Sequence, residues 1–311
     1  MDNKEKNFVS AVIYVYNNED IVCEALNRIS GVLKNHFGKA EIICVNDFSE
    51  DDSASKIKEY CDESQGISIT LLNMSHFHGV EMAMNAGVDL AIGDYVFEFD
   101  SCFIDYTDED VLDVYYTALK GFDIVSASSD KKQRFTSKLF YKIFAKFSNV
   151  DMDMNTERFR VLTRRAINRI DSMNKTIPYR KAIYANCGLK STNIIYKEQK
   201  IMDDTCANLG YYRLNLATDS LILFTDIGYR ITAFLTILMT LVMVGIAVYA
   251  LVVKLTSNPV RGWTTTVLFM TFAFAGLFAI LTIIIKYLNI LVDLTFKKKK
   301  YNYESVEKLT K

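Results

Sequence analysis

The sequence predicts an α/β domain built on a mostly parallel sheet, followed by two helices that cross a membrane as a hairpin. Strand-like apolar runs alternate with helical patterns through the first half of the chain. The runs are apolar almost without interruption, as in parallel strands covered on both faces. Two uncharged stretches, 231–253 and 263–285, each exceed the roughly 20 residues that a helix needs to cross a bilayer.

The elements of the α/β domain follow one another in a regular order. Strands are predicted at 8–16, 41–46, 67–73, 95–100 and 122–127. Helices are predicted between them, at 19–33, 52–61, 80–91 and 109–119, where apolar residues recur at helical spacing. This order favours a sheet in which most neighbouring strands run in the same direction.

Composition narrows the class of protein. The chain has 311 residues and a formal net charge of −1, and its first half has no basic stripe with interleaved aromatics that would suggest nucleic-acid binding. The amino-terminal residues are too polar for a signal peptide. The six cysteines contain no CxxC pair and lie mostly in apolar patterns, which is typical of reduced thiols in a cytosolic domain.

The two apolar stretches also predict the topology. The linker 254–262 is short and contains Asn258-Pro259, so both chain ends lie on one side of the membrane. The run Lys297–Lys300 places that side in the cytoplasm by the positive-inside rule. We therefore expect a multi-pass protein of the cytoplasmic membrane with four parts: a domain at 1–206, an amphipathic interface helix at 207–230, two membrane helices within 231–292 and a basic cytosolic tail at 293–311.

Polar residues follow the predicted strands where a ligand is expected. Asp100 comes directly after a buried strand, and ligands of open α/β sheets bind at the carboxyl ends of strands. No GxGxxG follows the first strand, and the chain has no GxxxxGK[ST]. Acidic and amide residues follow the first two strands instead, at 16–20 and 46–52. Such side chains can bind a base and ribose, with a cation neutralising a diphosphate.

An ordered set of motifs resembles one enzyme family. The segments are Tyr14–Glu19, Val45–Asp51, Gly79–Gly87, Asp100–Asp105 and Phe159–Arg164, with Gly262-Trp263, Lys286-Tyr287 and Tyr301–Glu304 later in the chain. Together they are similar to family 2 glycosyltransferases that act on polyprenyl phosphates, such as dolichol-phosphate mannose synthases and bactoprenol glucosyltransferases. The resemblance implies a GT-A fold in the amino-terminal domain.

The resemblance also implies roles for individual residues. Those expected at the nucleotide are Tyr16, Asn18, Asp47 and Asp100. Those expected at the acceptor phosphate are Arg158, Arg160, Arg164 and Lys200. Catalysis would depend on Asp100 and Arg160, and a Mg²⁺ or Mn²⁺ ion would be held by Asp100 and Asp105. Tyr16 can stack on uracil, Asp47 can accept its N3–H, and the Arg160 guanidinium can grip a phosphate.

The implied reaction is an inverting transfer of a sugar from a nucleotide, expected to be UDP, to a polyprenyl phosphate for cell-envelope glycans. A phosphate oxygen attacks the anomeric carbon and the nucleoside diphosphate leaves, so a divalent cation is the natural catalyst. The expected partners are the donor, the lipid acceptor, the bilayer and either a second copy of the chain or a small flippase, with no role for nucleic acid.

The sequence departs from the family pattern at the expected metal site. The family's Asp-x-Asp is Asp100-Ser101-Cys102, and a thiol is a poor ligand for a hard cation. Arg158 stands where the family has an aspartate, and Asn18 where it has a glutamate. Two interpretations stay open: a working transferase with a rebuilt site, or a degenerate relative that binds a nucleotide-sugar, a lipid phosphate or a membrane enzyme without turnover.

Overall fold

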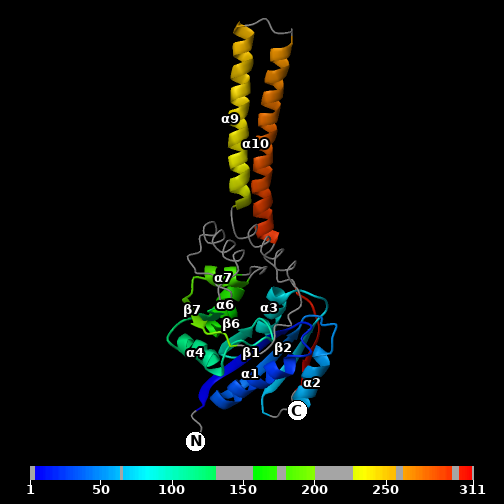
Figure 1. Cartoon of the computed structure of the whole chain (residues 1–311), viewed down its shortest axis with the longest axis vertical. Helices are drawn as coiled ribbons and strands as arrows, with labels where there is room; N and C mark the ends of the chain where they lie inside the picture. The colour runs from blue at the N-terminus through cyan, green and yellow to red at the C-terminus, as the bar shows by residue number, and fades with distance from the viewer. Residues whose placement is uncertain are drawn as a thin grey trace. The chain divides into compact units, whose positions relative to one another are not determined.

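The structure is a computed structural model that describes residues 4–63, 66–130, 157–173, 180–199, 227–256, 262–295 and 301–309. The chain divides into two compact units (Figure 1). The first comprises Met1–Ala217 together with Lys298–Lys311, and the second comprises Thr218–Lys297. The carboxyl-terminal residues therefore belong to the same unit as the amino-terminal domain.

The first unit contains an eight-stranded sheet in the order β7-β5-β6-β4-β1-β2-β3-β8. In chain order the strands are β1 (Glu5–Val15), β2 (Phe37–Asn46), β3 (Ser68–Met74), β4 (Tyr95–Phe99), β5 (Ile124–Ser129), β6 (Glu157–Thr163), β7 (Ser191–Tyr196) and β8 (Tyr303–Lys308). The central strands β3, β2, β1 and β4 are parallel, as are β5 and β7. The predicted mostly parallel sheet is confirmed.

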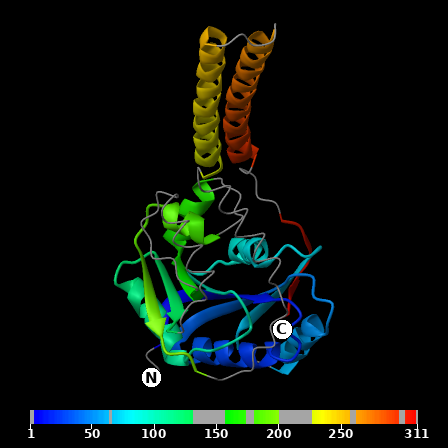
Figure 2. The same cartoon turned by 45° about the horizontal axis from the view of Figure 1, so that its top comes forward.

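Helices cover both faces of this sheet, which explains why the central strands β1, β2 and β4 are largely apolar. The helices of the unit are α1 (Val22–His36), α2 (Ser53–Glu63), α3 (Val80–Leu90), α4 (Asp108–Leu119), α6 (Arg164–Ser172) and α7 (Arg180–Asn186). Ala11 and Ile13 of β1 share a core with Leu26 of α1. Val12 points to the other face, where a Cβ added to Gly87 of α3 would lie 2.4 Å from its Cγ1. Figure 2 shows α1 and α3 on opposite sides of the strands.

Three strands, β6, β7 and β8, were not among the predicted elements, and β7 pairs parallel with β5 at one edge of the sheet. Strand β6 inserts between β4 and β5 and is antiparallel to both. Strand β8 pairs antiparallel with β3 and closes that edge of the sheet. Its residues fall within the stretch predicted as a basic tail, 293–311, so part of that stretch is a component of the α/β unit.

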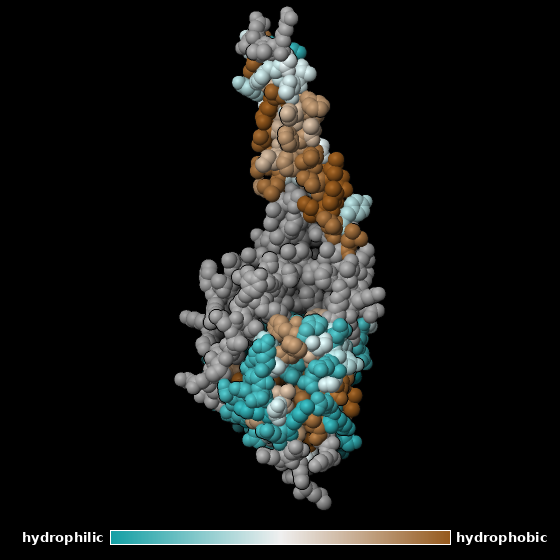
Figure 3. All heavy atoms as spheres, turned by 90° about the vertical axis from the view of Figure 1, so that its right-hand side faces the viewer, coloured by the Kyte–Doolittle hydropathy of each residue, from teal (hydrophilic) through white to brown (hydrophobic). Residues whose placement is uncertain are grey.

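The second unit contains two long apolar helices, α9 (Ile227–Thr256) and α10 (Trp263–Thr295). Their segments Ala233–Thr256 and Trp263–Leu288 are long and apolar enough to cross a membrane, and Figure 3 shows apolar side chains along the visible face. The hydroxyls of Thr236 and Thr282 form a 2.6 Å hydrogen bond between the helices. The pair is consistent with the predicted transmembrane hairpin. Most of the predicted interface helix and the lysine run 297–300 lie outside the described residues.

Candidate active site

The loops that follow β1 and β2 are hydrogen-bonded to each other at the carboxyl end of the sheet. The Asn17 amide donates to the Ser49 hydroxyl at 3.1 Å, and the Glu50 amide donates to the Asn17 side chain at 2.9 Å. The Asn18 amide donates to the Ser53 hydroxyl at 2.9 Å. The polar residues predicted after the two strands therefore form one structure, at the edge where ligands of such sheets bind.

Asp47 lies at the centre of this edge with its side chain fully buried. Its carboxylate accepts the amide of His78 at 2.8 Å, the amide of Gly79 at 2.7 Å and the Tyr14 hydroxyl at 2.9 Å. Gly79 has a φ of +81°, a conformation that glycine adopts without strain, and this turn aims its amide at Asp47. Burial raises the pKa of Asp47, although these three donors partly oppose the shift. Direct contact of Asp47 with a base stays a prediction.

Aromatic side chains lie beside the same loops. The Tyr16 ring packs on Phe77 with centroids 4.7 Å apart, and the Tyr16 amide donates to the Asn18 side chain at 3.3 Å. Phe48 is 47% exposed and has a φ of +61°, a backbone conformation that is strained for residues other than glycine. The resemblance aligns Phe48 with a glycine in the family motif that matches Val45–Asp51.

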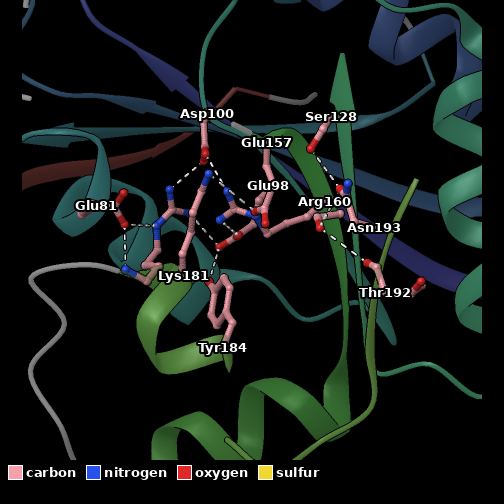
Figure 4. A network of polar contacts seen from close by, with 12 residues as sticks. Glu81, Glu98, Asp100, Ser128, Glu157, Arg160, Lys181, Tyr184, Thr192 and Asn193 are labelled. Atoms are coloured by element: carbon pink, nitrogen blue, oxygen red, sulfur yellow. Dashed lines mark hydrogen bonds and ion pairs between the residues drawn. The ribbon is translucent and has the colours of Figure 1, made fainter. Parts of the chain in front are cut away.

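Asp100 follows β4 and is held by two arginines (Figure 4). Its carboxylate accepts Arg160 at 2.7 Å and Arg180 at 2.6 Å, one through each oxygen. Burial alone would raise the pKa of Asp100, but the charges of Arg160 and Arg180 outweigh it and lower the pKa to about 2. The Asp100 side chain is 22% exposed, whereas both arginine side chains are 1% exposed. The carboxylate is therefore ionised, fixed in orientation and open to solvent.

A buried network supports the two arginines from behind. Glu98 is fully buried and bridges them, with oxygens 2.9 Å from Arg160 and 2.9 Å from Arg180. Glu81 forms an ion pair with Arg180, and Glu157 forms ion pairs with both Arg160 and Lys181. The Tyr184 hydroxyl donates a hydrogen bond to Glu98. Within the part of the chain that the structure describes, three cations (Arg160, Arg180, Lys181) face four carboxylates (Glu81, Glu98, Asp100, Glu157), an excess of one negative charge. Among the described residues this network would therefore gain from a partner that brings positive charge.

Asp105 belongs to a separate group of contacts. Its buried carboxylate accepts Arg158 at 3.0 Å and the Tyr196 hydroxyl at 2.7 Å. Cys102 is also buried, and its thiol donates to the Tyr14 carbonyl at 3.4 Å. The described residues contain no group of three or more His, Cys, Asp or Glu side chains that could hold a metal ion. Among the predicted ligands, Asp100 alone has a carboxylate that reaches solvent.

A site with one protein carboxylate still fits a divalent cation of the magnesium type. Such ions are often held by one or two carboxylates together with substrate phosphates and water. Each Asp100 oxygen keeps a lone pair beyond the one that an arginine occupies. The excess negative charge of the network also favours a cation over a bare diphosphate. The role of Asp105 as a second ligand stays a prediction that its contacts do not favour.

The residues predicted at the acceptor phosphate are spread over different environments. Arg160 is buried among carboxylates, whereas the Arg158 side chain is 32% exposed. Arg164 donates to the carbonyls of Gly93 at 3.0 Å and Ala91 at 2.8 Å, so it braces the turn before β4. Lys200 lies outside the described residues. The side chains of Arg160 and Asp100 thus meet, whereas the Arg158 side chain contacts Asp105 and the Arg164 side chain contacts the turn before β4.

Several residues of the site were not predicted from the sequence. Arg180, Glu98 and Tyr184 form the network, and Tyr14 binds Asp47. Glu98 alternates with apolar neighbours inside a strand, and this inward-facing charge was the one local signal available. Arg180 comes from a short helix far along the chain, and no local pattern marks it.

Known proteins with similar sequences are glycosyltransferases. The sequence model of Glycosyl transferase family 2 matches residues 10–183, more than half of the 311-residue chain. The chain belongs to glycosyl transferase family 2. This family 2 chain is 28% identical to an uncharacterized glycosyltransferase of Synechocystis sp., over 80% of the chain and 79% of that relative. It is 28% identical to a prophage bactoprenol glucosyl transferase homolog of Escherichia coli, over 73% of the chain and 75% of the relative.

Among solved structures, the family 2 chain resembles mannosyltransferase PcManGT from Pyrobaculum calidifontis, solved in complex with GDP-Man and Mn²⁺. The TM-score is 0.50 at 14% identity, and the match covers 72% of this chain and 64% of that protein. The chain thus spans less than two thirds of that protein's length. The expected GT-A fold is confirmed, and the chain is a glycosyltransferase by family.

Proposed function

We propose that this family 2 glycosyltransferase moves a sugar from a UDP-sugar to a polyprenyl phosphate at the cytosolic face of a membrane, with inversion at the anomeric carbon. The observation that carries the proposal is Asp100, an ionised carboxylate at the end of β4 in a family 2 domain. The bactoprenol relative and the apolar helices α9 and α10 support a lipid-linked acceptor.

The donor nucleotide is proposed to bind at the linked loops after β1 and β2. The Tyr16 ring would stack on the base, as aromatic side chains do with nucleobases. Asn18 and Asp47 line the same edge, with Asp47 holding the turn at Gly79 in place. UDP is our choice of donor from the resemblance, and a mannosyltransferase with GDP-Man on a similar fold makes GDP the first alternative to test.

Asp100 would hold a Mg²⁺ or Mn²⁺ ion together with the donor diphosphate. When bound, the cation would offset the negative charge that develops on the leaving diphosphate. Arg160 and Arg180 would keep the Asp100 carboxylate ionised and correctly oriented. A polyprenyl phosphate is already an anion at neutral pH, so its oxygen needs no dedicated general base to attack the anomeric carbon. Arg158, the more exposed of the two arginines on β6, is proposed to meet the acceptor phosphate.

The decisive experiment incubates the purified full chain with undecaprenyl phosphate, radiolabelled UDP-sugars or GDP-mannose, and Mn²⁺ or Mg²⁺. We expect a labelled lipid with one donor, and no labelled lipid with Asp100→Asn. Nucleotide binding without any labelled lipid would favour the alternative of a binding protein without turnover. If the chain neither binds a nucleotide nor transfers a sugar from any of the donors, the proposal is refuted.

A nucleotide titration tests the role of the cation separately. We expect UDP to bind the full chain more tightly with Mn²⁺ present than with EDTA, and Asp100→Asn to remove that difference. Equal affinity of the wild-type chain with and without Mn²⁺ would refute a metal role for Asp100 while leaving nucleotide binding intact.

A further inference from the structure

The carboxyl-terminal segment 301–309 contacts the loop that holds Asp47. Strand β8 pairs with β3 through Tyr303 to Lys308, and its side chains are anchored there: the Asn73 amide group donates to Ser305 at 3.0 Å and to Glu307 at 3.1 Å. Lys58 of α2 adds an ion pair to Glu307 at 2.8 Å. The strand is thus fixed to the sheet by side chains as well as by backbone pairing.

Just before the strand, Asn302 meets the loop 75–79. The Ser75 amide and hydroxyl both donate to the Asn302 carbonyl, at 3.2 and 3.1 Å. The Asn302 amide donates to Nε2 of His78 at 3.2 Å. These three contacts join Asn302 to both Ser75 and His78, near the two ends of the loop 75–79.

The contacts of His78 fix its ring. Nδ1 lies 2.6 Å from the His76 carbonyl, which can only accept, so Nδ1 carries the hydrogen and Nε2 is left to accept from Asn302. The His78 side chain is 5% exposed, and its ring stacks on His76 with centroids 3.9 Å apart. Both nitrogens of a nearly buried imidazole are therefore used, and one of them depends on the carboxyl-terminal segment.

The backbone of the same residue holds Asp47. The amides of His78 and Gly79 donate to the two Asp47 oxygens at 2.8 and 2.7 Å. A displacement of the His78 ring would move these amides, because ring and amide belong to one residue in a tight turn. A chain of hydrogen bonds thus runs from Asn302 through His78 to Asp47.

We propose that the backbone amide of Asn302, presented by strand β8, is a positioning group of the donor-nucleotide site. It fixes His78, and His78 and Gly79 fix Asp47. The inference rests on the proposed function, because the proposed function assigns the part of the sheet edge around Asp47 to the donor nucleotide. It implies that the segment following the second apolar helix in sequence is a structural part of the donor site.

The test compares two variants of the full chain in detergent. Asn302→Pro removes the N–H that His78 accepts, whereas Asn302→Ala removes the side chain and keeps that N–H. Hydrogen exchange at the amides of His78 and Gly79 reports the loop, and calorimetric titration with UDP and Mn²⁺ reports the site. With Asn302→Pro we expect faster exchange at both amides and about fivefold weaker UDP binding, the usual net effect of one hydrogen bond. With Asn302→Ala both quantities stay within about twofold of wild type.

A second variant, His78→Phe, shows whether the effects of Asn302→Pro come from the lost hydrogen bond or from misfolding. His78→Phe keeps a ring of similar shape and leaves β8 unchanged, but it offers no acceptor to Asn302, so it should reproduce both effects. Unchanged exchange at the two amides in both variants would overturn the link to Asp47. Faster exchange with unchanged UDP affinity would overturn the role in the donor site. Failure of the wild-type chain to bind any nucleotide would instead refute the proposed function, and the exchange measurement would still test the link.

Discussion

Replacing Asp100 with asparagine removes one negative charge from between two buried guanidinium groups. Asp100 accepts Arg160 at 2.7 Å and Arg180 at 2.6 Å, and its pKa is lowered to about 2. Burial acts in the opposite direction, so the arginine charges dominate. An asparagine could accept from one arginine only, because its amide nitrogen would face the other arginine as a second donor.

The pKa shift gives the size of the effect. A carboxyl with a pKa near 3.9 in the unfolded chain and about 2 in the folded one contributes roughly 2.6 kcal/mol to stability at neutral pH. Because the folded pKa is the lower one, this contribution is complete above about pH 5 and is lost as the pH falls through 4 towards 2. The side chain is 22% exposed, so we expect about 2 kcal/mol after screening by solvent.

Urea denaturation of the full chain in detergent, followed by a probe in the α/β unit, measures this contribution. Asp100→Asn should lower the free energy of unfolding by about 2 kcal/mol at pH 7, and the deficit should shrink steadily as the pH falls from 4 to 2. Asp113→Asn is the matched control, since Asp113 is exposed on α4. A deficit below about 0.5 kcal/mol at pH 7, or one that does not change with pH, would refute the electrostatic account.

Two further stability predictions use the backbone. Phe48→Gly should stabilise the fold by about 0.5–1 kcal/mol, because φ is +61° there, while Asn17→Gly at φ +49° should gain less since asparagine tolerates that region. A destabilised Phe48→Gly chain would mean that the ring stabilises the loop. Gly93→Ala should cost more than about 2 kcal/mol, because its Cβ would lie 2.6 Å from the Ser10 nitrogen. Gly31→Ala, with nothing within 4 Å inside α1, should gain about 0.5–1 kcal/mol, and equal effects of the two alanines would contradict the steric account.

The central strands and the location of Asp100 could be predicted because both depend on local pattern. Strands buried on both faces read as continuous apolar runs, and the residue that ends such a run is delivered to the carboxyl edge of the sheet. Strand β4 and Asp100 followed from this reasoning alone. The two apolar helices followed from length and the absence of charge.

The residues that complete the site could not be predicted because their partners lie far along the chain. Arg180 reaches Asp100 across 80 positions and Glu81 across 99. Strand β8 pairs with a strand more than two hundred residues earlier, and its sequence, YESVEK, carries three charges that obscure a strand pattern. Local periodicity reports which face is buried, but it says nothing about which distant cation neutralises a buried carboxylate.

Two departures from the family pattern prove to be linked in space. Cys102, which replaces the second aspartate, donates its thiol hydrogen to the Tyr14 carbonyl. Tyr14, which stands where the family motif matching Tyr14–Glu19 has a proline, donates its hydroxyl to Asp47. Both substitutions therefore lie in one buried group that holds Asp47, the carboxylate proposed for the donor site, in place. Of the two predicted metal ligands, Asp100 and Asp105, only Asp100 meets solvent, so we expect a cation to act through Asp100. The titration of UDP with and without Mn²⁺ thus tests the metal role of Asp100, whereas the labelled-lipid assay separates a transferase with a rebuilt site from a protein that binds without turnover.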